Sequence, residues 1–379
     1  PSTPDVSSAA SDVYKRQCDD RSRINANAAR DDMRAAIITE YGMPLEIANV
    51  PDPVLPRDGI IMKVRATGVC RSDWHTWMGH YGDQINLPLI PGHEMAGDVL
   101  EVGADVTGLQ PGDRVTVPFG LACGHCHICL QGHHQSSDLQ VHPSTNFDGS
   151  FAEMIALPRA NINVVTLPDE VGYAEAASLG CRFITAFRGV VEQAETRPGD
   201  WLAVHGCGGV GLSAVMIAAA MGANVVAVDI DDSTLEKASQ LGAVATVNAL
   251  RVGNVPEEII DITKGGAHAS MDSLGSTVTC QNSILCLRTL GRHIQVGLMK
   301  DAHANPEIPM GLVVSKEIDV RGSRGMSPKN YSSVFNMIKA GIVAPKSLIG
   351  SELSLEEGAA LLTQMDRFPG TGVSVITSF

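Results

Sequence analysis

The hydrophobic and polar positions follow different patterns in successive parts of the 379-residue chain. Residues 1–32 carry no periodic apolar pattern and are rich in Ser, Ala, Asp, Asn and Arg, so we expect disorder there. Part of this segment resembles a translated adapter sequence, which makes Met33 the expected true start. From Met33 to about residue 151, short runs such as 60–65 and 113–117 alternate apolar and polar side chains between Pro and Gly residues. This pattern predicts an all-β, barrel-like domain.

Between about residues 182 and 319 the pattern changes to strands that alternate with helices. The apolar run 201–205 is typical of a buried strand, a helix of small residues follows it as far as Met221, and the next strand is expected at 224–228. Alternation of this kind predicts a parallel sheet built from βαβ units.

The last segment, residues 320–379, is expected to carry two helices. One begins at Pro328 and ends near Gly341, and the other begins with a capping box formed by Ser354 and Glu357.

The turn that follows the strand at 201–205 reads Gly-Cys-Gly-Gly-Val-Gly, a fingerprint of dinucleotide binding. Gly206 allows the tight turn, Gly208 lets the backbone approach a pyrophosphate, and Gly211 permits close packing of the helix. Asp229 ends the next strand about twenty residues later, where its carboxylate can accept both ribose hydroxyls. A glycine turn without a ligand is a poor alternative in this context.

The residues after Asp229 bear on the choice between NAD and NADP. Ile230, Asp231 and Asp232 follow directly. Together with Asp229, the two further aspartates would confront a 2′-phosphate with three carboxylates and no nearby arginine. The sequence therefore favours NAD.

Composition narrows the class of function. A net charge of -14 and a pI near 5.2 argue against a nucleic acid or an anionic membrane surface as partner and favour a small-molecule substrate. The longest apolar run, 210–221, is shorter than the about 20 residues that span a bilayer.

The chain has nine Cys, several of them spaced Cys-x-x-Cys. This usage indicates metal binding in a reducing compartment, so we expect the cytoplasm. A mass of 40.0 kDa predicts two domains.

Three residues that are far apart in the sequence suit a metal ion. Cys70, His93 and Cys181 offer two thiolates and one imidazole, a set that fits Zn²⁺ with one coordination position left open for chemistry. Each residue alone could be an ordinary core or hinge side chain.

The stretches that contain these residues, 68–75, 92–94 and 179–181, resemble the motifs of zinc-dependent medium-chain alcohol dehydrogenases. Alcohol dehydrogenase is an established example of a catalytic zinc held by two cysteines and one histidine. The resemblance extends over nearly everything from Met33 to Phe379. It implies an α/β protein with a GroES-like β-barrel catalytic domain and a Rossmann domain with a doubly wound parallel sheet.

The resemblance also implies the domain boundaries. Residues 33–181 and 320–379 would form one discontinuous catalytic domain, and residues 182–319 would form the NAD-binding domain.

By the same resemblance, further residues acquire roles around the metal. Asp73 is expected to receive the other ring N–H of His93. Ser72 is expected to take the alcohol proton and to pass it, through the cofactor ribose, to His75. Glu94 is the acidic residue behind the metal, either beside the ligands or as an occasional ligand.

Other positions resemble the family's coenzyme and substrate contacts. Arg71 is similar to the cation that binds the pyrophosphate. The expected contacts of the nicotinamide and the glycine-rich turn are Thr185, Gly209, Val210, Val296 and Leu298. Tyr81 and Phe119 resemble pocket-lining aromatic residues. Any of these side chains could instead belong to the core.

One run departs from the family pattern. Cys123, Cys126 and Cys129 resemble the ligands of a structural zinc lobe, but the fourth cysteine is replaced by Ser137. A closed structural site normally has four ligands. The possible substitutes are His133, His134 and Asp138; otherwise the lobe holds little metal, or residues 135–139 contain a sequence error.

The expected function is a zinc-dependent alcohol dehydrogenase that transfers hydride reversibly between an alcohol and NAD, giving an aldehyde or ketone. Polyol, threonine and formaldehyde dehydrogenases of the same superfamily are the alternatives. A non-catalytic nucleotide-binding protein is a more distant one, and the intact Cys70, His93, Cys181 and Ser72 argue against it. Family resemblance implies a homo-oligomer, either a dimer or a tetramer.

Overall fold

The computed structural model describes residues 32–367 and 372–379. The prediction of disorder for the first 32 residues lies, apart from Asp32, outside the described residues. Two sheets organise the described chain, one mostly antiparallel and one entirely parallel, and a separate two-stranded sheet pairs β1 (Asp32–Ile37) with β2 (Glu46–Pro51).

The mostly antiparallel sheet has the strand order β14-β15-β3-β4-β5-β7, and one further strand, β6, pairs with β3. Its strands are β3 (Ile60–Val69), β4 (Met95–Val102), β5 (Arg114–Thr116), β6 (Met154–Leu157), β7 (Val165–Thr166), β14 (Ile349–Ser354) and β15 (Val373–Ser378). The runs 60–65 and 113–117 lie on β3 and β5, as predicted. Alternate residues of β3, Ile60, Met62 and Val64, face a common apolar core.

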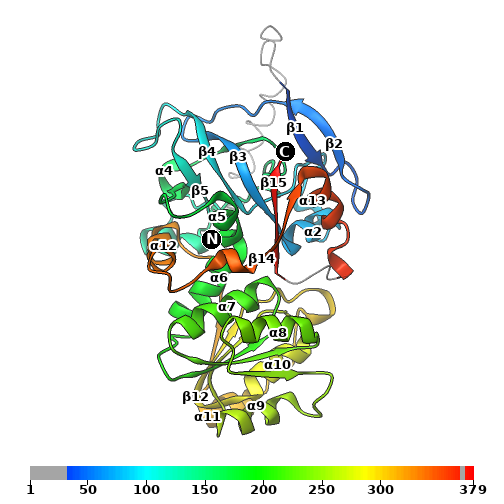
Figure 1. Ribbon diagram of the computed structural model, residues 1–379, viewed down its shortest axis with the longest axis vertical. Coiled ribbons are helices and arrows are strands. Elements are labelled where there is room, and N and C mark those ends of the chain that lie inside the picture. Colours follow the sequence, from blue (N-terminus) through cyan, green and yellow to red (C-terminus); the bar gives the residue numbers. More distant parts are fainter. Residues whose placement is uncertain (1–31, 368–371) are drawn as a thin grey trace, which may run out of the picture. The chain divides into compact units, whose positions relative to one another are not determined.

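The end of the chain returns to this sheet. In β15, Ser374 pairs with Val69 of β3, so strands from both ends of the described sequence share one set of hydrogen bonds (Figure 1). The exact domain boundaries at 181 and 320 stay a prediction.

The parallel sheet has the order β10-β9-β8-β11-β12-β13. Its strands are β8 (Trp201–His205), β9 (Asn224–Asp229), β10 (Ala245–Asn248), β11 (Ala267–Asp272), β12 (Leu287–Gln295) and β13 (Asp319–Gly322). The strand order reverses between β8 and β11, and in open α/β sheets the ligand binds beyond the carboxyl ends of the strands at such a switch point. This sheet confirms the predicted doubly wound Rossmann topology.

Helices follow the strands of the parallel sheet in alternation, as Figure 1 shows. They are α7 (Gly209–Ala220), α8 (Asp232–Gln240), α9 (Val255–Thr263), α10 (Thr277–Leu285) and α11 (Met310–Lys316). The helix α7 is buried along most of its length, which explains why its sequence is apolar and small on all sides rather than on one face.

The two predicted C-terminal helices are present. Pro328 opens a short 3₁₀ turn that leads into α12 (Tyr331–Lys339), and α13 (Leu355–Leu362) begins with the predicted capping box of Ser354 and Glu357. No helix within residues 32–367 and 372–379 combines the length and the apolar character needed to cross a membrane.

Candidate active site and its family

Three segments bring the predicted metal ligands together. Cys70 lies between the end of β3 and the start of α2 (Arg71–Trp77), and His93 lies just before β4. Cys181 lies on a π-helical turn, Leu179–Phe183, which follows α5 (Tyr173–Ser178). The ligand atoms of Cys70, His93, Glu94 and Cys181 all lie within 4.8 Å of one another. Side chains from distant parts of the sequence therefore form one buried cluster.

The imidazole of His93 is held in one orientation. Its Nδ1–H donates to Asp73 Oδ1 over 2.8 Å, and the same oxygen accepts from the Gly92 amide and the Ser144 hydroxyl, both at 2.9 Å. Nε2 is buried and has no hydrogen-bond partner among the described residues. Because Nδ1 donates to Asp73, Nε2 is the ring nitrogen whose lone pair is left for a metal ion.

The two thiols of the cluster interact directly. A hydrogen bond from Cys181 lowers the pKa of the Cys70 thiol well below its usual range, and the same bond raises the pKa of Cys181. Two sulfurs that share a proton, beside an unpaired imidazole nitrogen, are a donor set that a zinc ion satisfies by replacing that proton. The residues present therefore fit a catalytic zinc with an open position.

Glu94 connects the cluster to Arg182, the residue that follows Cys181. Both of its oxygens accept from the guanidinium of Arg182, one of them from Arg182 Nε at 3.0 Å, and the Cys181 amide donates to the carboxylate at 3.1 Å. Burial raises the pKa of Glu94 to about 7, and the Arg182 charge opposes that rise. Gly180 is required beside this pair, because a Cβ there would lie 2.6 Å from the Cβ of Glu94. Glu94 thus binds Arg182 and the turn that carries Cys181.

Arg182 connects this cluster with the glycine-rich turn. A Cβ on Gly209, the first residue of α7, would lie 2.5 Å from Arg182 Cδ, so the glycine there makes room for the arginine. Sequence reasoning did not single out Arg182, although its place next to Cys181 was the available signal.

The glycine-rich turn has the geometry that its sequence predicts. Gly206 has a φ of +84°, a conformation that favours glycine, and Gly208 faces open space where a Cβ would meet nothing within 4 Å. A Cβ on Gly211 would collide with the Gly206 carbonyl, which confirms the close packing expected there. The N-terminus of α7 therefore presents free backbone to an approaching anion.

Asp229 organises the far side of this turn. One carboxylate oxygen accepts from the Cys207 amide at 2.7 Å, and the other accepts from the amides of Ile230 and Asp231 at 2.7 and 3.1 Å. The carboxylate thus lies at the end of β9 against the turn, where the sequence placed it.

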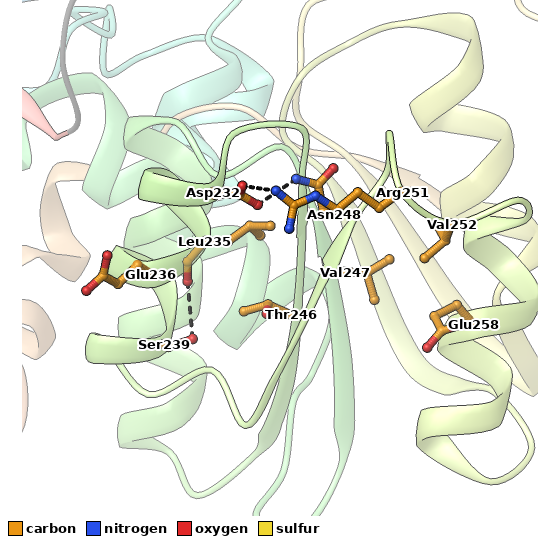
Figure 2. Close-up of a pocket in the computed structure, with 10 residues that line it drawn as sticks. All are labelled: Asp232, Leu235, Glu236, Ser239, Thr246, Val247, Asn248, Arg251, Val252 and Glu258. Carbon is orange, nitrogen blue, oxygen red and sulfur yellow. Dashed lines mark hydrogen bonds and ion pairs between the residues drawn. The ribbon is translucent and has the colours of Figure 1, made fainter.

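The expectation that no arginine lies near this region is wrong. Arg251 forms a salt bridge with Asp232, and the Asn248 side chain donates to the same carboxylate at 2.8 Å. Figure 2 shows these residues around a surface pocket of about 340 Å³ between α8 and the loop after β10. Arg251 was missed because it lies on a loop 19 residues after Asp232 in the sequence.

Comparison with known proteins agrees with this architecture. Residues 56–169 match the alcohol dehydrogenase GroES-like domain, and residues 209–340 match the zinc-binding dehydrogenase family. The chain belongs to the zinc-dependent medium-chain alcohol dehydrogenase family. The predicted GroES-like and Rossmann domains are thereby confirmed as types, together with the α/β class.

Individual relatives match most of their own length. An alcohol dehydrogenase of a Moraxella species is 34% identical over 86% of this chain and 87% of its own, and a sorbitol dehydrogenase of Bacillus subtilis is 32% identical over 86% and 91%. Among solved structures, an alcohol dehydrogenase from a Thermus species superposes with a TM-score of 0.83 at 28% identity, covering 92% of this chain and all of that one.

The residues expected for the proton relay lie close to the cluster but are not joined into a chain. The Ser72 hydroxyl is 3.8 Å from Cys70 Sγ, and His75 Nδ1 is 2.8 Å from His80 Nδ1. Within the described residues no hydrogen bond links Ser72 directly to His75. Burial, followed by the charges of Lys300 and His80, lowers the pKa of His75 to about 4, so its ring is neutral at pH 7 rather than poised there.

The weaker family positions differ in how near they lie to this cluster. The Phe119 ring packs edge-on to His93 with centroids 6.3 Å apart, and burial, then the charge of Cys70, raises the pKa of Tyr81 to about 12. Thr185 donates to the Cys181 carbonyl at 2.5 Å. Arg71 donates to the Met365 carbonyl at 2.7 Å.

Three other predicted coenzyme contacts lie on the parallel-sheet side of the site. Val210 is half-buried on α7 and Val296 is half-buried just after β12, whereas Leu298 is 54% exposed. Their contact with the coenzyme stays a prediction.

The three cysteines of the lobe lie close together, and the Ser137 hydroxyl lies beside them. The sulfurs of Cys123, Cys126 and Cys129 are within 4.8 Å of one another. The Ser137 hydroxyl donates to Cys123 Sγ at 3.3 Å and lies 3.7 Å from Cys126 Sγ. Ser137 therefore occupies the place of the fourth ligand, so a weak oxygen donor stands where the family has a thiolate.

Two of the proposed substitutes are engaged elsewhere. His134 Nδ1 contacts the Gly132 carbonyl at 3.2 Å and the Ser327 hydroxyl at 3.2 Å, and Asp138 pairs with His127 at 3.1 Å. His133 is exposed.

We expect Ser137→Cys to convert this cluster into a tight four-thiolate zinc site. Because structural zinc contributes folding energy, the variant should keep its lobe zinc under mild chelation and melt at a higher temperature, by about 2–4 °C for each kcal/mol gained. In the unchanged protein the same chelation should strip this zinc first and lower stability before activity. Metal analysis with melting curves before and after chelation measures both effects.

Ser136→Cys is the matched control, because Ser136 is exposed on the same turn. It should change neither metal retention nor melting temperature. If the unchanged protein holds two zinc ions per chain that resist chelation equally, the lobe that contains Ser137 binds its zinc tightly and the prediction is refuted.

Proposed function

We propose that the chain is a zinc-requiring, NAD-dependent alcohol dehydrogenase that interconverts a small or medium alcohol and its aldehyde or ketone. The observation that carries the proposal is the cluster of Cys70, His93 and Cys181, which brings two sulfurs and a ring nitrogen within 4.8 Å of one another. Within the described residues, Nε2 of His93 has no hydrogen-bond partner. Through Glu94 and Arg182 this cluster is joined to the start of α7 at the dinucleotide turn.

Cys70, His93 and Cys181 would hold zinc, and the turn at 206–211 with Asp229 would hold NAD. The metal would supply a Lewis acid for the alcohol oxygen, and the coenzyme would supply the hydride acceptor. The protein's own groups then orient and move the proton. Asp73 fixes the ring of His93 through Nδ1, so Nε2 stays available.

Ser72 is the side chain that receives the alcohol proton. Its hydroxyl lies near Cys70 at the mouth of the cluster, and His75, paired with His80, carries the proton toward water. His75 is neutral at pH 7 and so has a lone pair to accept the proton, but its pKa of about 4 makes it a weak base that passes the proton on rather than keeping it.

A polyol dehydrogenase is the second candidate, because a sorbitol dehydrogenase is among the relatives.

We also propose a homo-oligomer and a cytoplasmic location. β13 lies at an edge of the parallel sheet, and exposed apolar side chains sit on it and on the preceding helix α11, among them Val314 and Val320. The eight cysteines within the described residues are free thiols, which suits a reducing compartment.

A panel of primary, secondary and polyhydric alcohols with NAD and with NADP, followed by absorbance of the reduced cofactor, tests the proposal. We expect turnover of at least one alcohol class with a kcat/KM that strongly favours NAD, because Asp229 repels a 2′-phosphate. Asp229→Gly should shrink the NAD to NADP ratio by about tenfold or more, since like charges brought together cost several kcal/mol.

Glu236→Gln serves as control, because Glu236 lines the pocket of Figure 2 from α8, seven residues after Asp229 in the sequence. It should leave the ratio unchanged. A preference of the unchanged enzyme for NADP would refute the role given to Asp229.

A further inference from the structure

Arg324 lies just after β13 and has only neutral partners. Its Nη2 donates to Gln140 Oε1 at 3.2 Å and lies 3.4 Å from His142 Nε2. Its guanidinium carbon is 5.8 Å from the centroid of the Phe119 ring. Within the described residues no carboxylate forms a salt bridge with it, although the chain as a whole has an excess of acidic groups and a net charge of -14.

The partners of Arg324 are themselves fixed. His142 Nδ1 lies 3.3 Å from the Phe119 carbonyl, which requires Nδ1 to donate and leaves Nε2 as the acceptor for Arg324. Burial, then the charge of Arg324, lowers the pKa of His142 to about 4, so this neutral tautomer persists at pH 7. The ring stacks on Phe119 with centroids 5.9 Å apart. Arg324 is thus held by acceptors that leave its positive charge uncompensated.

This arginine belongs to the surroundings of the metal cluster. The Phe119 ring that lies 5.8 Å from its guanidinium carbon also packs against His93, with 6.3 Å between centroids. One aromatic ring therefore contacts both the arginine and a metal ligand. The backbone is tied as well, because the Gly325 amide donates to Thr185, and Thr185 donates to the Cys181 carbonyl.

A second cation lies near the aromatic residues of the site. Lys300 Nζ sits 3.8 Å from the centroid of the Tyr81 ring, is buried, and has no hydrogen-bond partner among the described residues. Burial and the charges of Cys70 and Cys181 raise the pKa of Tyr81, and the charge of Arg324 opposes that rise. Two cations, Arg324 and Lys300, therefore lie beside the aromatic residues Phe119 and Tyr81.

We propose that the physiological substrate is an alcohol that carries a carboxylate away from its reacting carbon, and that Arg324 binds this carboxylate above the Phe119 ring. The proposal rests on the proposed dehydrogenase function and names its substrate class. The planar fork of arginine matches the two oxygens of a carboxylate, and an aromatic face beside it suits an apolar spacer between the two ends of the substrate. Lys300 adds positive potential that attracts the same anion.

The decisive comparison uses 4-(hydroxymethyl)benzoate and its methyl ester, which share the alcohol and the ring but differ in charge. The unchanged enzyme should oxidise the carboxylate with a kcat/KM at least about tenfold above that of the ester, the effect expected from hydrogen bonds to a charged group. Arg324→Gln should reduce kcat/KM for the carboxylate about 10- to 100-fold and leave that for the ester within a few-fold.

Two further variants complete the test. Arg324→Lys keeps the charge but loses the fork, so its preference for the carboxylate should fall between those of the unchanged enzyme and Arg324→Gln. Arg57→Gln removes an exposed arginine that pairs with Asp105, and it should alter the turnover of neither substrate. An ester preferred by the unchanged enzyme, or an equal loss on both substrates in Arg324→Gln and Arg324→Lys, would overturn the proposal.

Binding separates this proposal from the function on which it rests. Both compounds can be titrated calorimetrically into the enzyme saturated with NADH, in which no hydride can leave the alcohol. The carboxylate should bind at least about tenfold more tightly than the ester, and Arg324→Gln should remove the difference. Equal affinities would overturn the carboxylate site even if neutral alcohols are oxidised, whereas a failure to oxidise any alcohol would count against the dehydrogenase alone.

Discussion

Cys181→Ala is expected to abolish alcohol oxidation and to remove one zinc ion per chain while NAD still binds. Cys181 supplies one of two sulfurs in the cluster, and its loss leaves Cys70 and His93 as an incomplete site. Polarisation by a metal ion is worth several kcal/mol, so kcat/KM should fall by more than about 1,000-fold. Turnover, zinc content and the affinity for NADH, followed by fluorescence, are the measurements.

The affinity for NADH should change little, because the turn at 206–211 is held by its own backbone and by Asp229. Cys280→Ala is the control, since Cys280 is a buried free thiol on α10, outside both cysteine clusters. It should retain zinc and turnover. Full activity in a Cys181→Ala protein that lacks this zinc would refute the metal mechanism.

Residues within short motifs could be assigned from the sequence because their chemistry is local. The spacing around Cys70 and Asp73 fixes where both side chains lie on one short helix and its N-cap, and the order of Gly206, Gly208 and Gly211 dictates a turn that few other sequences form. The alternating and apolar runs also predicted β3, β5, β8 and β9 close to their observed bounds.

What the sequence did not reveal depends on contacts between distant segments. Arg182 acquires its role only because Glu94, 88 residues earlier, is folded against it. Arg324 stands beside Phe119 although about two hundred residues separate them in the sequence. The π-helical turn at Cys181 has no pattern of its own, since a helix with this turn and a regular helix share the same residue types.

The side chain at the fourth position of the cysteine lobe could not be assigned from the sequence for a different reason. A missing cysteine could be read from the sequence, but whether His133, His134, Asp138 or the serine itself faces the thiols depends on side-chain direction. The contact of His134 with Ser327 and the pairing of Asp138 with His127 engage these two side chains elsewhere, and no local pattern encodes the contact with Ser327.

The pair of Glu94 and Arg182 is the second feature with a large expected effect. Glu94 is fully buried, Arg182 is 8% exposed, and two donors of the guanidinium meet the two carboxylate oxygens. At a pH about one unit above the pKa of Glu94, which burial raises to about 7, the carboxylate is ionised. There Glu94→Gln keeps the shape of the side chain but leaves the guanidinium charge without compensation. Removing one partner of a buried ion pair destabilises a protein by about 3–5 kcal/mol, so we expect the free energy of unfolding to fall by that amount.

Urea unfolding followed by tryptophan fluorescence measures this loss, and the double variant Glu94→Gln with Arg182→Met identifies its cause. If the buried charge is responsible, removing it should restore a large part of the stability, because an apolar side chain of similar length tolerates burial where an unpaired cation does not. The exposed pair of Arg57 and Asp105 provides the contrast, since Asp105→Asn should change the unfolding midpoint very little. A double variant that is no more stable than Glu94→Gln would show that Arg182 is needed for its packing against Gly209 rather than for its charge.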